Sequence, residues 1–211
     1  MNTKVSGTRA VIGAILVILS GCGGVGVGTG TGQPAAPTGR VGADALVLPG
    51  YGTLTQAQFT LELESGDLRI QVTPLAESVI RLAAPDTYQR LTGISASAGA
   101  SLRARTREES PLFLVSMFSR APTVTYEPEN LHIVNGGLRY RPTAIQAITP
   151  GWGGQRLRQQ ETQLAVYAFD PGIELEIALT VEYEGASNTS WQIILNRLEA
   201  ERARVRARIG A

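Results

Sequence analysis

The stretch that decides the fold alternates apolar and polar side chains without a break, Ile173-Glu174-Leu175-Glu176-Ile177-Ala178-Leu179-Thr180-Val181-Glu182-Tyr183-Glu184. Successive side chains of a strand point to opposite sides of a sheet, so the apolar residues of this stretch would share one face. The other face would carry Glu174, Glu176, Glu182 and Glu184. The pattern predicts an antiparallel strand over residues 173–184, with one face on a core and the other hydrated.

Further strands are predicted on both sides of this stretch. Two hairpins are expected, one turning at Ser65-Gly66-Asp67 and one at Asn135-Gly136-Gly137, where the turn residues tolerate positive φ. Residues 112–118 are apolar on both faces, which is typical of a central strand. With residues 163–169, these runs predict a sandwich of about seven or eight antiparallel strands.

Helical spacing appears in two places. Leu75, Val79 and Leu82 would share one face, which predicts one or two short helices over about 75–92. A second stripe runs from Trp191 to Ile209 and predicts a C-terminal helix over about 189–209. The small and polar residues 95–110 predict a loop or a ragged edge strand.

The N-terminus has the order of features expected of a secretory signal. Lys4 and Arg9 precede a short apolar run, residues 10–19, and the chain then reads Leu19-Ser20-Gly21-Cys22. A helix of that length would rise only about 15 Å, roughly half of a bilayer's hydrocarbon core. This segment resembles a bacterial lipoprotein signal with its lipobox. The resemblance implies cleavage after Leu19, Ser20 and Gly21, acylation of Cys22 with chains such as palmitate, and membrane attachment without a span.

Three regions follow from this interpretation. Residues 1–21 would be the signal peptide, residues 22–50 a Gly- and Pro-rich flexible tether, and residues 51–211 a β-sandwich domain with its C-terminal helix. The run from Tyr126 to Tyr140, leading on to residues 166–169, resembles immunoglobulin-like domains of extracytoplasmic bacterial lipoproteins. That resemblance implies a mainly β, immunoglobulin-like sandwich that serves as a binding or structural module.

Composition narrows the chemistry. The formal charge is +1, and without Lys4 and Arg9 it becomes −1, so no electrostatic case for nucleic acid follows. The only cysteine is Cys22 and the only histidine is His132, so neither a disulfide nor a Cys- or His-cluster metal site is expected. His132 alternates with Leu131 and Ile133 and is predicted on the wet face of its strand. No cofactor, metal or catalytic residue is nominated.

One loop stands out as a candidate for recognition. Trp152 lies among glycines and is followed by Arg156 and Arg158, a combination enriched at interaction hot spots. The competing interpretation is that Trp152 folds back and closes one end of the sandwich.

The combined expectation is a cell-envelope lipoprotein, anchored to the lipid bilayer through acylated Cys22, that acts as a non-catalytic protein-interaction or structural module. Its partner would be another envelope protein. Gly23 follows Cys22 where an inner-membrane retention signal typically has Asp, which favours the periplasmic face of the outer membrane in a two-membrane cell. A small-ligand or ion-binding protein is the alternative, and an envelope hydrolase ranks third.

Overall fold

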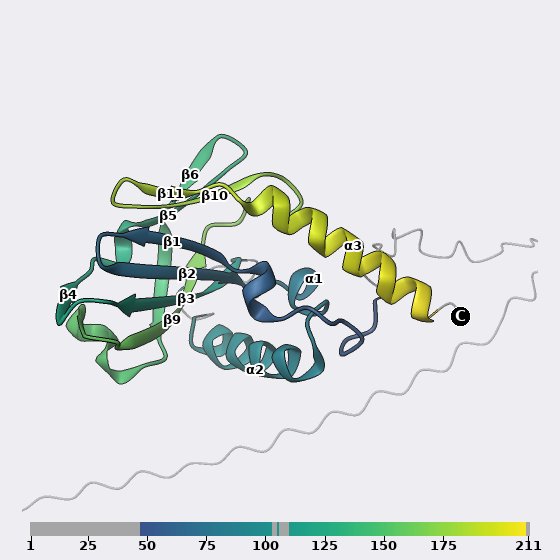
Figure 1. The fold of residues 1–211 in the computed structure, drawn as a ribbon, viewed down its shortest axis with the longest axis horizontal. Coiled ribbons are helices and arrows are strands. Elements are labelled where there is room, and N and C mark those ends of the chain that lie inside the picture. Colours follow the sequence, from purple (N-terminus) through teal and green to yellow (C-terminus); the bar gives the residue numbers. More distant parts are fainter. Residues whose placement is uncertain (1–46, 103–104, 106–109, 210–211) are drawn as a thin grey trace, which may run out of the picture. The chain divides into compact units, whose positions relative to one another are not determined.

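The computed structural model describes residues 47–102, 105 and 110–209 (Figure 1). The predicted signal peptide, the lipobox Leu19-Ser20-Gly21-Cys22 and most of the predicted tether lie outside these residues. The elements are, in chain order, η2 (Gln56–Phe59), β1 (Leu61–Ser65), β2 (Leu68–Pro74), α1 (Glu77–Ile80), α2 (Pro85–Leu102), β3 (Leu112–Ser119), β4 (Thr123–Thr125), η3 (Pro128–Asn130), β5 (Leu131–Asn135), β6 (Leu138–Tyr140), β7 (Pro142–Ala147), η4 (Pro150–Gly154), β8 (Arg156–Arg158), β9 (Thr162–Phe169), β10 (Leu179–Tyr183), β11 (Ala186–Asn188) and α3 (Trp191–Ile209).

The strands form antiparallel sheets, as predicted. The larger sheet has the order β1-β2-β3-β9-β7, the second has the order β11-β10-β5-β6, and β4 pairs with β8 in a third. The hairpin β1–β2 turns at Gly66, whose φ of +56° suits a residue without a side chain. The hairpin β5–β6 turns at Gly136 and Gly137, both with positive φ, which is the conformation of a type I′ turn. Both predicted hairpins are therefore confirmed.

One continuous apolar core joins the two larger sheets. Leu61, Ile70 and Val115 of the larger sheet and Ile133 and Val181 of the second are fully buried members of the same cluster. Burying such a side chain stabilises a fold by roughly 1.5–3 kcal/mol relative to leaving it in water. At the sheet edge the Asn188 side chain donates a hydrogen bond to the carbonyl of Glu62, which ties β11 to β1.

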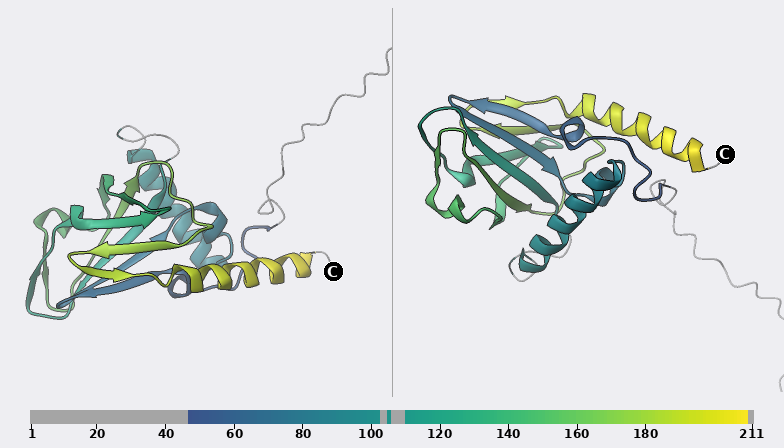
Figure 2. Two further views of the ribbon diagram at one scale, coloured as in Figure 1. Left: turned by 90° about the horizontal axis from the view of Figure 1, so that it is seen from above. Right: turned by 60° about the horizontal axis from the view of Figure 1, so that its bottom comes forward.

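The helices cover different parts of this β-rich body (Figures 1 and 2). α2 contacts β7 and β9, whereas α3 contacts η2 and β10. The mainly β class with short helices and a C-terminal helix is confirmed, and α3 begins and ends within the predicted range. Among the described residues no helix has the length and apolar character needed to cross a membrane. Val47 is already buried in the core, a few residues before the predicted domain start at residue 51.

The prediction of one strand over 173–184 is wrong in its first half. The strand begins at Leu179, and residues 171–178 form turns and irregular backbone. The cause is Asn135, which is buried and whose amide nitrogen donates to the carbonyls of Glu174 and Ala178 at 2.9 and 3.0 Å. Its amide oxygen accepts from the Glu174 N–H at 2.8 Å, so one side chain replaces the ladder that a partner strand would supply.

The prediction of a loop or edge strand over 95–110 is wrong for residues 95–102, while residues 103, 104 and 106–109 lie outside the described part of the chain. α2 continues to Leu102, and the short helices expected over 75–92 are α1 and a much longer α2. Leu91, Ala98 and Leu102 are buried members of α2 at spacings of seven and four residues. Alanine has the highest helix propensity, so small residues continue a helix even where large apolar residues are sparse.

Replacing Asn135 tests whether its hydrogen bonds hold the 174–178 segment. Asn135→Ala should lower the free energy of unfolding by about 2–3 kcal/mol, because several buried polar groups lose their partner together. The matched control is Asn130→Ala, since Asn130 donates one exposed side-chain bond to Glu184 and should cost less than about 0.5 kcal/mol. Urea unfolding measures both, and equal effects would contradict the assigned role.

Candidate interaction site

The site is built from η4, β4 and β8, which lie beside the start of β9. β4 pairs with β8 so that Val124 faces Leu157, and Leu157 is fully buried. The neighbours of Leu157, Arg156 and Arg158, point the other way because strand side chains alternate, and both are exposed.

Trp152 does not reach the surface with these arginines but lies in the core next to them. It is only 5% exposed, and its ring packs edge-to-face against Tyr126 and Tyr167, with centroid distances of 5.3 and 6.0 Å. Edge-to-face aromatic pairs contribute about 0.5–1.5 kcal/mol each beyond area burial. Trp152 thus belongs to the core, as the competing interpretation of the sequence expected, whereas Arg156 and Arg158 reach the surface.

Gln163, which no sequence pattern pointed out, connects the buried aromatic cluster of Trp152 and Tyr126 to the rim of the site. It is buried at the start of β9 and accepts a hydrogen bond from the Tyr126 hydroxyl at 2.5 Å. Its amide nitrogen donates to the Arg156 carbonyl at 3.2 Å and to Glu161 Oε1 at 2.8 Å. Burial, and next the charge of Glu161, raise the pKa of Tyr126 to about 12, so its hydroxyl remains a donor at neutral pH.

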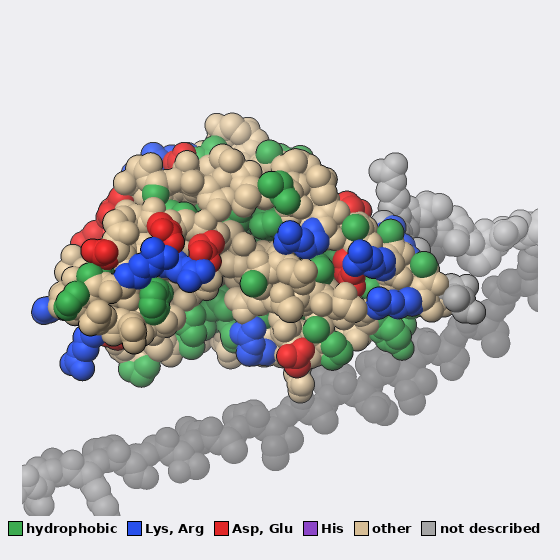
Figure 3. All heavy atoms as spheres, in the orientation of Figure 1, with side chains coloured by type: hydrophobic (Ala, Val, Ile, Leu, Met, Phe, Trp, Pro, Cys, Tyr) green, Lys and Arg blue, Asp and Glu red, His purple; other side chains and the backbone are tan. Residues whose placement is uncertain are grey.

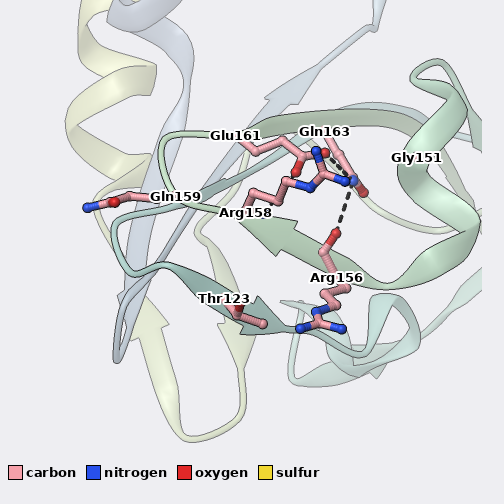
Figure 4. Close-up of a pocket in the computed structure, with 7 residues that line it drawn as sticks. All are labelled: Thr123, Gly151, Arg156, Arg158, Gln159, Glu161 and Gln163. Carbon is pink, nitrogen blue, oxygen red and sulfur yellow. Dashed lines mark hydrogen bonds between the residues drawn. The ribbon is translucent and has the colours of Figure 1, made fainter.

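These residues surround an open depression of about 740 Å³ (Figure 4). It is lined by Thr123, Gly151, Arg156, Arg158, Gln159, Glu161 and Gln163. In the close-up the side chain of Gln159 points away from the others, while Arg158 and Glu161 lie on the same side as Gln163.

The charge of the depression is basic, since two guanidinium groups face one carboxylate. Glu161 accepts a 2.8 Å hydrogen bond from the Arg158 backbone N–H, and this bond, with that of Gln163, lowers the pKa of Glu161. Glu161 is therefore ionised at neutral pH. Within residues 47–102, 105 and 110–209, no hydrogen bond or ion pair uses the guanidinium of Arg156 or Arg158. Their N–H donors are available to a ligand with negative charge.

Two other predicted features lie elsewhere. The prediction that His132 is on a wet face is wrong, because it is only 6% exposed. Its Nδ1 lies 2.7 Å from the Asn130 carbonyl, and its buried Nε2 has no hydrogen-bond partner. Burial is the main reason that the pKa of His132 is lowered.

The predicted hydrated glutamate face is partly retained. Glu174, Glu176 and Glu184 are exposed, and half-buried Glu182 pairs with Arg139 at 3.1 Å. Among the described residues no group of three or more His, Cys, Asp or Glu side chains is placed to hold a metal ion.

Comparison with known proteins adds no family to this geometry. Neither a protein-family model, nor a curated protein, nor a solved structure matches the chain. The resemblance to immunoglobulin-like lipoprotein domains therefore stays a prediction from the sequence.

Gly151→Ala tests the packing of the depression. A Cβ at residue 151 would lie 2.7 Å from Gln163 Nε2, which cannot retreat without losing its bonds to Arg156 and Glu161. The substitution should lower the free energy of unfolding by about 1–2 kcal/mol. Gly153→Ala is the matched control, since a Cβ there meets nothing within 4 Å. If urea unfolding finds both variants equally stable, Gln163 is not held as described.

The single histidine gives the protein a pH-dependent stability. The folded-state pKa of His132 lies below its ordinary value of 6.5, so unfolding takes up a proton in acid. Stability should therefore be complete above about pH 6.5 and fall as the pH decreases below it. His132→Gln should show a smaller loss between about pH 7.5 and 5.5 than the parent protein, measured by urea unfolding. A parent protein that is equally stable at both pH values would contradict this.

Proposed function

We propose that the protein is a lipid-anchored component of the bacterial cell envelope whose β-rich body is a non-catalytic protein-interaction module. The observation that carries the proposal is the pair of exposed guanidinium groups, Arg156 and Arg158, at the rim of an open polar depression. The partner surface that fits this chemistry is an acidic segment of another envelope protein.

The shape of the depression favours a macromolecular partner. Sites for small molecules are typically closed and mainly apolar, whereas this depression is open and its lining side chains are polar or charged, Gly151 apart. Arginine is enriched at protein interfaces because its planar guanidinium can bind a carboxylate with two parallel hydrogen bonds. The alternative, a small anionic ligand, would use the same two side chains.

The fixed geometry behind the arginines also supports binding. Both arginines lie on a strand whose middle residue is buried, and the Arg156 carbonyl is held by Gln163. A backbone that is already fixed loses less conformational entropy on association, so more of the interaction energy appears as affinity.

The proposed localisation in the cell envelope rests on the N-terminal sequence. Acylation of Cys22 would hold the body at a membrane surface, and two or more acyl chains make such anchoring stable. Gly23 after the cysteine favours the periplasmic face of the outer membrane.

Site-specific photocrosslinking in intact cells tests the interaction. A photoreactive residue at Gln159, exposed on the rim, should give one heavier protein adduct, whereas the same residue at Ser187, exposed on β11, should not. Arg156→Glu with Arg158→Glu should remove the adduct, because the rim would then repel an acidic partner.

Two results would contradict the proposal. One is an equal pattern of adducts from Gln159 and Ser187, which indicates random encounters. The other is the absence of any adduct from Gln159, which favours the small-ligand alternative.

A further inference from the structure

α3 carries more arginines than acids, and Arg197, Arg204 and Arg208 are exposed on the side that it leaves in water. Its buried stripe consists of Trp191, Ile194, Leu198, Glu201 and Val205. The helix also carries five arginines and only one further acid, Glu199; the arginines are Arg197, Arg202, Arg204, Arg206 and Arg208. Half-buried Arg202 pairs with Glu199, and Arg204 pairs with Glu201 at 3.2 Å, so both acids of the helix are neutralised and the helix keeps a net positive charge.

The start of the described chain is fixed beside the C-terminal half of this helix. Glu201 is fully buried, and its Oε1 accepts bonds from the Thr53 backbone N–H and hydroxyl at 2.9 and 2.8 Å. Further along, Arg208 donates to the carbonyl of Tyr51 at 3.2 Å. Figure 2 shows the same arrangement, with the first described residues running next to α3.

Exposed apolar side chains occur on these same two segments. Leu48, Tyr51 and Ile209 are 47%, 52% and 40% exposed. In the space-filling view, basic side chains are spaced along α3 with apolar ones between them (Figure 3). A basic surface with scattered apolar and aromatic side chains is the composition of protein segments that lie on anionic membranes.

We propose that the C-terminal half of α3, together with residues 47–53, docks on anionic phospholipid headgroups. The orientation rests on the proposed anchoring through Cys22. An anchored chain would enter the body at Val47, beside this surface, and the 24 residues that connect Cys22 to Val47 span at most about 85 Å, which is enough for the surface to reach the bilayer. Arginines near an anionic leaflet each strengthen binding roughly fivefold, and the effect is confined to about one Debye length.

The docked orientation has a consequence for the candidate interaction site. The β4–β8 end of the body lies away from the C-terminal end of α3 (Figure 1). Docking through α3 would therefore leave Arg156 and Arg158 facing the aqueous space, where a partner can reach them.

Lipid-attached quenchers test the contact on the anchored protein. Cys22 is the only cysteine, so acylation leaves an introduced cysteine as the one thiol to label. The protein is reconstituted in phosphatidylcholine vesicles with or without phosphatidylglycerol, and a fluorophore is placed at Ala207→Cys on α3 or, as control, at Gln159→Cys. A headgroup nitroxide should quench the Ala207 label at least threefold more than the Gln159 label, only in the anionic vesicles. Salt of about 0.5 M should reverse this difference because it screens surface charge.

Matched charge variants assign the effect to the helix. Arg204→Gln with Arg208→Gln should abolish the extra quenching. Arg139→Gln with Arg141→Gln, which removes the same charge from β6 and the residue after it, should retain it. Circular dichroism of each variant verifies that the helix is still folded.

The inference fails if the label at position 207 is quenched no more than the label at position 159. It also fails if the quenching does not depend on lipid charge and salt concentration. A second, reactive thiol at Cys22 would instead overturn the anchoring proposal. In that event the label is measured on a Cys22→Ser chain added to preformed vesicles. Charge-dependent quenching of this chain would still support docking, and the absence of such quenching would still overturn the docking proposal.

Discussion

The body is held together without a disulfide bond, by apolar packing and buried hydrogen bonds, because no cysteine follows Cys22 in the chain. The shared apolar core of the two larger sheets supplies the stability that disulfides give to many small domains. Trp191 shows how one side chain contributes both packing and a hydrogen bond to this core. It is fully buried at the first turn of α3, and its indole N–H donates to the Leu175 carbonyl at 2.9 Å, so one side chain joins the helix, the 171–178 segment and the core.

Within such a core, three buried polar side chains define where segments meet. Asn135 binds the backbone of residues 174–178, so that β10 begins only at Leu179. Gln163 shapes the depression, and Glu201 fixes the start of the described chain to α3. Each is almost fully buried, and each makes at least two side-chain hydrogen bonds, of which one or more joins a segment distant in sequence. A buried polar group costs stability unless it is paired, so these residues specify one arrangement among the many that apolar packing would allow.

Sequence patterns predicted the elements that depend on apolar packing, and they failed where a buried polar side chain decides the structure. Apolar alternation correctly predicted both hairpins, and helical spacing correctly predicted α3. Alternation failed at residues 173–178, because a period of two in sequence does not reveal that Asn135 occupies the backbone groups. It also failed for His132, since β5 is buried on both faces while its pattern resembles a half-exposed strand. Arg156 and Arg158 were predicted together as part of a recognition loop, whereas Gln163 was missed. The sequence signal that could have identified Gln163 is a single amide side chain near the start of a mainly apolar strand.

The proposals for interaction and for membrane docking share one premise, which is that Cys22 carries lipid and the body lies outside the cytosol. The most direct test is the intact mass of the protein extracted from washed cell membranes. A mature chain that begins at Cys22 and carries the added mass of a diacylglyceryl group and a further acyl chain is the predicted result. A chain that retains residues 1–21, or one with an unmodified thiol at Cys22, would contradict it.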